Sequence, residues 1–191
     1  MGKNRVVVVL ADGFEEIEAV VPIDVMRRAG LDVVVAGLKS SAAKGAHGMS
    51  FRCDCTLSSV AAEDVGAVVL PGGMPGASNL HDSAVVNELV LSVYGRGGYV
   101  CAICASPAVV LAPLGILDGR SAVCYPGMEA CAPDTTFEKV GAGNGPCVIR
   151  DGNVITGAGP GCAFGFAYEI VSALCGCDAV YGLKESMVWE G

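Results

Sequence analysis

Tyr99-Val100-Cys101-Ala102-Ile103-Cys104-Ala105-Ser106-Pro107-Ala108-Val109-Val110-Leu111 is the stretch from which the fold of this chain can be argued. Residues 99–103 are apolar and partly β-branched or aromatic, which is typical of a strand covered on both faces. Pro107 suits the first turn of a helix, because the N–H that proline lacks would be unpaired there. The stretch therefore predicts a buried strand that turns at once into a helix, with Cys104 at the corner.

Cys104 has the placement of a nucleophile. A residue at this corner faces the start of the following helix, whose free N–H groups and dipole favour a thiolate. This is the arrangement of a nucleophile elbow, with cysteine in place of serine. The alternative is that Cys104 is one more buried apolar residue, since free cysteines are among the most buried residue types. The local stretch leaves both interpretations open.

The N-terminal part of the chain predicts a parallel sheet. Residues 5–10 and 31–37 are valine-rich runs typical of buried strands. The helix expected between them begins with glutamates and ends with arginines and Gly30, as the helix dipole and glycine capping favour. Pro22 predicts a kink or a restart within this helix. A strand, a helix and a second strand in this order are typical of parallel sheets.

The rest of the chain extends the same pattern. The helix after Cys104 is expected to end near Gly115. The other expected elements are a loop at 39–48, a short hairpin or edge strand at 49–53, strands at 67–70 and 121–124, a helix at 83–94, a hairpin over 147–156 with an Asp-Gly turn, and helices at 162–174 and 178–187. With no repeat or linker, the sequence predicts one α/β domain over residues 1–191, with helices on both faces of a mostly parallel sheet.

Composition excludes several classes of function. The net charge of −8 argues against nucleic-acid binding, which needs a basic face. No apolar run reaches the length of about 18 residues that a membrane span needs, and the N-terminal residues show no signal-peptide pattern. The ten cysteines lie in apolar runs, so we expect reduced thiols in a cytoplasmic protein. Only one cysteine pair has the spacing of a zinc knuckle, so no metal site is expected.

Two glycines stand where a site is expected. Ligands of open parallel sheets bind at the carboxyl ends of the strands, and the loops at 11–18, 71–76 and 104–107 fall there. Gly72 and Gly73 allow close backbone approach and, with the N–H of Ala105, could form an oxyanion hole. A simple tight turn is an equally good interpretation of the glycine pair.

Glu18 is the candidate partner of Cys104. It lies about one turn into the first expected helix, so its side chain could face the thiol. A carboxyl beside a thiolate has a raised pKa and, when protonated, donates a hydrogen bond to sulfur. The alternative is that Glu15, Glu16 and Glu18 form a solvated first turn, which the residues alone favour. The two histidines, His47 and His81, are expected at the surface.

These residues carry a family resemblance. The chain resembles the ThiJ/PfpI superfamily and, within it, the DJ-1 branch of deglycase-like proteins. The matching motifs are Leu10-Ala11-Asp12-Gly13-Phe14-Glu15-Glu16-Ile17-Glu18, Pro22-Ile23-Asp24-Val25-Met26-Arg27-Arg28-Ala29-Gly30, Val69-Leu70-Pro71-Gly72-Gly73, Ala102-Ile103-Cys104-Ala105-Ser106-Pro107 and Gly159-Pro160-Gly161. The resemblance implies a flavodoxin-like three-layer sandwich and a homodimer.

The resemblance also implies residue roles. Cys104 matches the family's reactive, readily oxidised cysteine, and Glu18 matches the protonated glutamate that hydrogen-bonds it. The backbone anion pocket matches Gly72, Gly73 and Ala105. Two further matches lie near the family's dimer interface: Arg28 and Cys53.

Three positions depart from the family pattern. Tyr125 stands before Pro126, where the branch often has a histidine, so an imidazole acid or base is missing there. Ala105 follows the cysteine where protease-like members have histidine, which argues against peptidase activity. Cys101 replaces a small residue and either fills the core or resolves an oxidised Cys104.

The function implied is an enzyme that acts on reactive α-oxoaldehydes. Cys104 would attack methylglyoxal, glyoxal or their early adducts on thiols and amines, Glu18 would shuttle a proton, and hydrolysis would release lactate or glycolate. This glyoxalase or deglycase chemistry needs no metal or organic cofactor. The alternative is a non-enzymatic oxidative-stress sensor or redox-regulated chaperone, in which Cys104 is oxidised to sulfinic acid.

Overall fold

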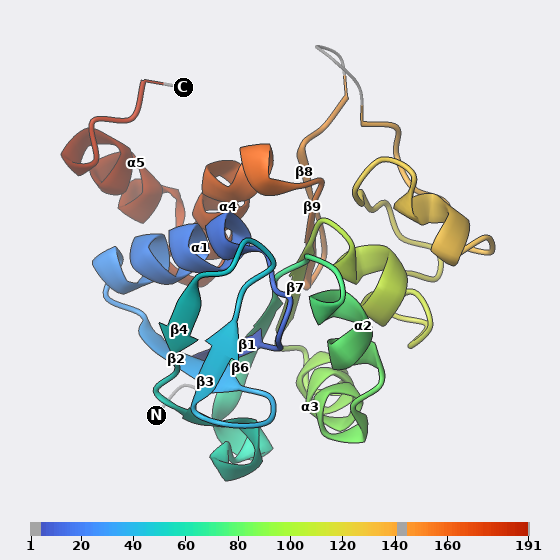
Figure 1. Cartoon of the computed structure of the whole chain (residues 1–191). Helices are drawn as coiled ribbons and strands as arrows, with labels where there is room; N and C mark the ends of the chain where they lie inside the picture. Colours follow the sequence, from blue (N-terminus) through green and yellow to red (C-terminus); the bar gives the residue numbers. More distant parts are fainter. Residues whose placement is uncertain (1–4, 141–144, 191) are drawn as a thin grey trace.

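A seven-stranded sheet forms the centre of the computed structural model, which describes residues 5–140 and 145–190 (Figure 1). The strand order is β5-β2-β1-β6-β7-β9-β8. All neighbours pair in parallel except β8 with β9. The strands are β1 (Arg5–Leu10), β2 (Asp32–Gly37), β5 (Cys55–Thr56), β6 (Val65–Leu70), β7 (Tyr99–Ile103), β8 (Val148–Asp151) and β9 (Val154–Gly157).

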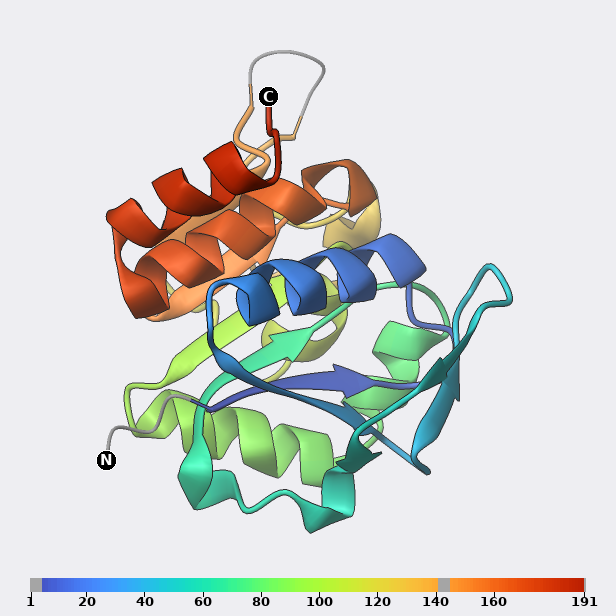
Figure 2. The ribbon, with the colours of Figure 1, turned by 90° about the vertical axis from the view of Figure 1, so that its left-hand side faces the viewer.

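Helices cover both faces of this sheet. One face carries α1 (Glu16–Arg28), α4 (Ala163–Cys175) and α5 (Cys177–Ser186), whereas α3 (Ala84–Gly95) lies on the opposite face (Figure 2). Two separate apolar clusters fill the spaces between the sheet and these two layers. The mostly parallel sheet between two helical layers confirms the predicted fold class.

The valine runs form the sheet because they can be buried on both faces. The central strands β1, β6 and β7 are almost wholly inaccessible, as parallel strands covered by helices must be. Pairing of Val8 with Val69, and of Val69 with Cys101, aligns the three strands. Their carboxyl ends therefore meet at one edge of the sheet, where the loops after them lie close together.

A small second sheet lies beside the start of α1. It pairs β3 (Ala42–Lys44) with β4 (Ser50–Arg52) in antiparallel fashion. Phe14 joins it through a bridge to Gly45 and an edge-to-face contact with Phe51, with ring centroids 6.3 Å apart. The strand predicted within residues 49–53 is present as β4, but it pairs with β3, which lies inside the segment 39–48 that was expected to be a loop.

The first helix passes through Pro22 without interruption, so the predicted restart is wrong. Pro22 is buried, as are Ala19, Ile23 and Val25 on either side of it. Packing of this apolar face against the sheet and α4 keeps the helix continuous, although Pro22 has no N–H to donate to the preceding turn.

The segment after the nucleophile is shorter than predicted. Residues Pro107–Leu111 form a single π-helical turn, η3, in which Ala112 N donates to Pro107 O at 3.0 Å. Turns follow it instead of a longer helix. A glycine-rich stretch after β6 contains a helix that the sequence did not reveal, α2 (Gly76–His81).

The strand predicted at 121–124 is absent from the described chain. This segment runs beside β9, but Val123 N donates to the side-chain Oγ1 of Thr156 at 3.0 Å, so no backbone ladder forms. The remaining short helical turns are η1 (Leu57–Ser59), η2 (Ala62–Asp64), η4 (Met128–Cys131) and η5 (Pro160–Cys162). Among the residues described, no helix combines the length and apolar character needed to cross a membrane.

Candidate active site

Cys104 stands at a strained corner between β7 and η3. Its φ of 65° lies in the left-handed region that residues other than glycine rarely adopt. Two hydrogen bonds hold the corner: Cys104 N donates to Gly157 O at 2.9 Å, and Cys104 O accepts from Tyr125 N at 2.8 Å. The side chain is 9% exposed. This is the geometry of a nucleophile elbow, which the sequence predicted at this residue.

Glu18 is brought to Cys104 by the first turn of α1. Its side chain is fully buried, and Oε2 accepts the N–H of Gly72 at 2.8 Å. Within the described residues, Oε1 has no N–H or O–H partner, and the carboxyl interacts with the Cys104 thiol. Glu15 and Glu16 are also buried. The interpretation of these three glutamates as a solvated first turn is therefore wrong.

Burial controls the ionisation of Glu18. It raises the pKa of this carboxyl to about 7, although the thiol of Cys104 and the N–H of Gly72 act in the opposite direction. Desolvation disfavours the charged form of a carboxyl, which accounts for the direction of this shift. Glu18 is therefore poised to exchange a proton near neutral pH.

The surroundings of Cys104 raise the pKa of its thiol instead of lowering it. Burial raises this pKa to about 12, and the charge and hydrogen bond of Glu18 add to the effect. The N–H groups of Gly73 and Ala105 act in the opposite direction but do not dominate. Burial and the carboxyl of Glu18 thus oppose the thiolate that the helix N-terminus was expected to favour. The thiol and the carboxylate are instead arranged for proton transfer between them.

The three backbone groups of the predicted anion pocket divide into two roles. The N–H groups of Gly73 and Ala105 interact with the sulfur, but the N–H of Gly72 donates to Glu18. In this structure the N–H of Gly72 is therefore engaged with Glu18, and the anion pocket that includes it stays a prediction. The lack of a side chain at Gly72 still matters, because a Cβ there would lie 2.6 Å from the Cβ of Cys104 and 2.8 Å from Glu18 Oε2.

Two further side chains, Ser106 and Glu15, hold the site together, and neither was predicted to do so from the sequence. Ser106 is fully buried, and its Oγ donates to Pro71 O at 2.6 Å, which ties the nucleophile corner to the loop after β6. Glu15 accepts the N–H of Glu18 at 2.8 Å and donates its own N–H to Gly72 O at 2.9 Å. The acidic Glu15-Glu16 pair before an apolar helix was the only available signal for this cap.

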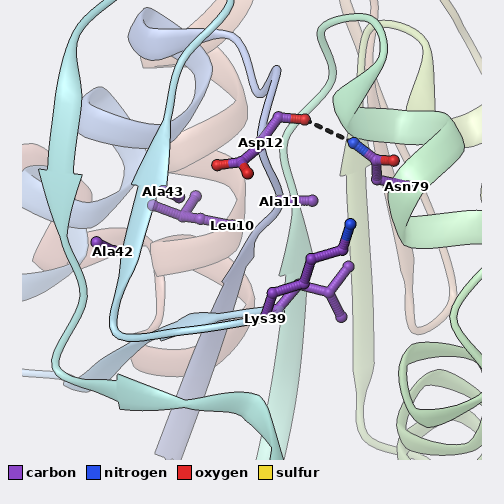
Figure 3. A pocket seen from close by; sticks show the side chains of 8 residues that line it. Leu10, Ala11, Asp12, Lys39, Ala42, Ala43 and Asn79 are labelled. Atoms are coloured by element: carbon purple, nitrogen blue, oxygen red, sulfur yellow. Dashed lines mark hydrogen bonds between the residues drawn. The ribbon is translucent and has the colours of Figure 1, made fainter.

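A small pocket lies at the carboxyl end of β1, on the turn that leads to α1 (Figure 3). Asn79 Nδ2 donates to Asp12 O at 2.8 Å across it, and Asp12 Oδ1 accepts from Lys44 N at 2.9 Å. Cys104 and Glu18 are not among the lining residues. These bonds fix the turn that carries Glu18, and the pocket is not part of the candidate site.

The accessory residues are placed as follows. Tyr125 lies next to the site, with its backbone bound to Cys104 O and its ring, 47% exposed, against Gly159. Cys101 is fully buried in β7, and burial raises the pKa of its thiol strongly. Arg28 is exposed and pairs with Asp24 at 2.7 Å, away from Cys104 along α1. Cys53 is buried next to Gly37.

Glu16 connects α1 to the β3–β4 hairpin. Its Oε1 accepts from His47 N at 2.8 Å and Met49 N at 3.3 Å, and Oε2 lies 2.9 Å from His47 Nδ1. Glu15, Glu16 and His47 each offer one possible metal-ligand atom, and these three atoms lie within 4.8 Å of one another. Both oxygens of Glu16 are already engaged with the hairpin, so this group is best explained as a structural tie. The His47 side chain is 72% exposed, as predicted.

Comparison with known proteins agrees with the fold. The DJ-1/PfpI family model matches residues 4–173. The chain is 38% identical over 190 residues to the Parkinson disease protein 7 homolog of Danio rerio, covering 98% of each chain. It is 35% identical to the glutathione-independent glyoxalase DJR-1.2 of Caenorhabditis elegans, covering 97% of this chain and 96% of that protein. The crystal structure of Drosophila melanogaster DJ-1beta superposes with a TM-score of 0.89 at 36% identity, with 97% of each chain covered.

Fold and site thus define a flavodoxin-like α/β protein with a cysteine at a nucleophile elbow and a buried glutamate beside it. The chain belongs to the DJ-1/PfpI family.

Proposed function

We propose that this protein converts α-oxoaldehydes such as methylglyoxal or glyoxal, or their early adducts on thiols and amines, to 2-hydroxy acids without a cofactor. The observation that carries the proposal is the buried pair of Cys104 and Glu18, whose carboxyl has a pKa of about 7. A nucleophile and a base in contact are the minimum requirement for covalent catalysis on an aldehyde. The relative named a glutathione-independent glyoxalase supports the class of substrate.

In the first step, the sulfur of Cys104 attacks the aldehyde carbon. Glu18, whose pKa burial raises to about 7, takes the thiol proton as the carbon–sulfur bond forms. The carbonyl oxygen becomes the hydroxyl of a hemithioacetal when that proton is passed on. The N–H groups of Gly73 and Ala105 face the sulfur and are available to stabilise negative charge there.

In the second step, Glu18 moves a proton between the two carbons of the substrate. It removes the proton from the former aldehyde carbon and returns one to the neighbouring carbon, while the hydroxyl proton on the first carbon passes to the oxygen of the second. The hemithioacetal thereby becomes a thioester of the 2-hydroxy acid. No external oxidant is needed, because one carbon is oxidised while the other is reduced. Water then hydrolyses the thioester and restores the Cys104 thiol.

The test is turnover without glutathione. Reduced protein is incubated with many equivalents of methylglyoxal, and lactate is measured over time. We expect multiple turnovers, lost in Cys104→Ser and lowered about 10²- to 10⁴-fold in Glu18→Gln, which is the range for removing a general base. Glu63→Gln is the matched control, because this exposed carboxyl lies outside the site. Consumption of about one equivalent by the wild type would refute catalysis.

A second candidate function uses the same residues. Sulfur flanked by the N–H groups of Gly73 and Ala105 is suited to hold the oxygens of a sulfinate, as a peroxide sensor or redox-regulated chaperone requires. Stoichiometric peroxide titration with mass analysis of Cys104 separates the two functions. Sulfinate formation without aldehyde turnover would favour the sensor.

A further inference from the structure

Cys147 and Cys162 bring two thiols together outside the candidate active site. Cys147 directly precedes β8, and Cys162 ends η5 at the start of α4. The backbone sets their positions: Ala158 N donates to Cys147 O at 2.9 Å, and Cys162 N donates to Gly159 O at 2.8 Å. These two bonds hold Cys147 and Cys162 beside the adjacent residues Ala158 and Gly159, and the Cys147 side chain lies near enough to raise the pKa of the Cys162 thiol. Two cysteines placed in this way can form a disulfide when their Cα atoms lie within about 7 Å of each other.

The exposure of the pair allows an oxidant to reach it. Cys147 is exposed and Cys162 is partly buried. Cys101, by contrast, is fully buried, and Cys177 has its sulfur 3.5 Å from Ser172 Oγ. Gly161, which immediately precedes Cys162, has open space around it, so the backbone there can adjust.

We propose that Cys147 and Cys162 are a peroxide-reactive dithiol that closes to a disulfide, as a second oxidation site independent of Cys104. In the first step, the sulfur of the exposed Cys147 attacks a peroxide oxygen, which gives a sulfenic acid and releases water. In the second step, the sulfur of Cys162 attacks the sulfenic sulfur and displaces a second water. The two thiols lose two electrons and two protons in total, and hydrogen peroxide accepts them. A dithiol reductant reverses the reaction by exchange.

The order of these steps follows from the surroundings of the two thiols. Burial raises the pKa of Cys162 to about 11, and Cys147 adds to the shift. Cys162 is therefore a poor first nucleophile at neutral pH and a better resolving group. Cys147 is the more exposed thiol of the pair and therefore reacts first with the peroxide.

This dithiol lies on the backbone that supports the nucleophile corner. The loop between β9 and η5 begins at Gly157, whose carbonyl accepts the N–H of Cys104 at 2.9 Å. A bridge from Cys147 to Cys162 would close a ring around the β8–β9 hairpin and this loop. Oxidation would thus restrain the segment on which the elbow rests, without consuming Cys104.

The test is made in a Cys104→Ser background, so that its outcome does not depend on the proposed aldehyde chemistry. Protein is treated with hydrogen peroxide, remaining thiols are alkylated, and unreduced peptides are analysed by mass spectrometry. We expect a linked pair of peptides carrying Cys147 and Cys162, lighter by two hydrogen atoms, and loss of alkylation at both residues. Dithiothreitol should restore alkylation.

Matched variants make the result specific. Cys147→Ser should abolish the linked peptides and leave Cys162 open to alkylation, whereas Cys131→Ser, which removes another exposed cysteine, should change nothing. Full alkylation of Cys147 and Cys162 after peroxide would overturn the proposal. A bond from either residue to another cysteine, or one found only between two molecules on a non-reducing gel, would overturn it equally.

Discussion

Glu18 links the stability of the fold to pH at the scale of a single residue. Its folded pKa of about 7 lies above the usual value of about 4.5 for a glutamate, so the folded state favours the protonated form. The contribution of Glu18 to stability is then fully present at low pH and is lost as pH rises from the unfolded pKa through the folded one. The size of this loss is about 3 kcal/mol for a shift of this magnitude.

We expect Glu18→Gln to remove this pH dependence. Between pH 4.5 and 7.5, the free energy of unfolding of the wild type should fall by about 3 kcal/mol relative to the variant. Urea denaturation at the two pH values measures the difference, and Glu63→Gln serves as an exposed control. Parallel pH profiles for wild type and Glu18→Gln would show that the carboxyl is not desolvated.

Ser106 offers a second test at this scale. Ser106→Ala should cost about 1–3 kcal/mol, because it leaves the buried carbonyl of Pro71 without its partner. Ser59→Ala is the matched control, since Ser59 Oγ also donates to a backbone carbonyl, that of Thr56, but on the surface. Its cost should stay within about 0.5 kcal/mol. Equal costs in thermal or chemical unfolding would contradict the role given to Ser106.

At the scale of elements, Glu16 fastens the β3–β4 hairpin to α1. Burial raises the pKa of Glu16, but hydrogen bonds from His47 and Met49 outweigh it and leave the pKa lowered. The pKa of His47 is raised by its hydrogen bond to Glu16. The stabilisation from the Glu16 carboxylate is therefore lost as pH falls through the pKa of Glu16. The stabilisation from the His47 imidazolium is lost as pH rises through the pKa of His47.

Hydrogen exchange can test this tie. We expect Glu16→Gln to speed exchange of the His47 and Met49 amides, which donate to Glu16, and to remove the pH dependence of their protection. The Cys53 amide, which donates to Ser41 O at 3.0 Å in the same region, is the internal control. Unchanged protection of residues 47 and 49 in the variant would contradict the proposed tie.

Features set by interactions between neighbouring residues were predictable from the sequence, and features set by contacts between distant segments were not. The apolar runs of β1 and β7 and the corner at Cys104 were predictable, because burial on both faces and turn chemistry leave a local pattern. Residues 121–124 have the apolar pattern of a strand. The N–H of Val123, however, donates to the side chain of Thr156, so it does not take part in a backbone ladder. The hydrogen bond from the N–H of Gly72 to Glu18 and the burial of Glu15 depend on contacts between distant loops, which no local pattern predicts.

At the scale of the whole molecule, the outer side of α1 carries exposed apolar residues. Ile17 is 50% exposed and Val20 is 40% exposed, and neighbouring exposed apolar side chains can mark a contact surface. We predict that the protein is a homodimer that covers these residues. Sedimentation equilibrium should give the dimer mass for the wild type.

Val20→Asp should weaken this dimer about 100-fold or more, because it places an unpaired charge in an apolar contact. Val85→Asp is the control: Val85 is 50% exposed but belongs to α3, on the opposite face of the sheet. Equal association of both variants would place the contact surface elsewhere.

The left-handed backbone of Cys104 has a consequence for how sequences of this kind diverge. A side chain in that conformation works against folding by about 1–2 kcal/mol, so only its chemistry keeps a cysteine there. Where a lineage no longer needs the thiol, drift should replace it with glycine or asparagine, which tolerate the conformation best. A survey of substitutions at this one position would therefore separate descendants that retain the chemistry from those that retain only the scaffold.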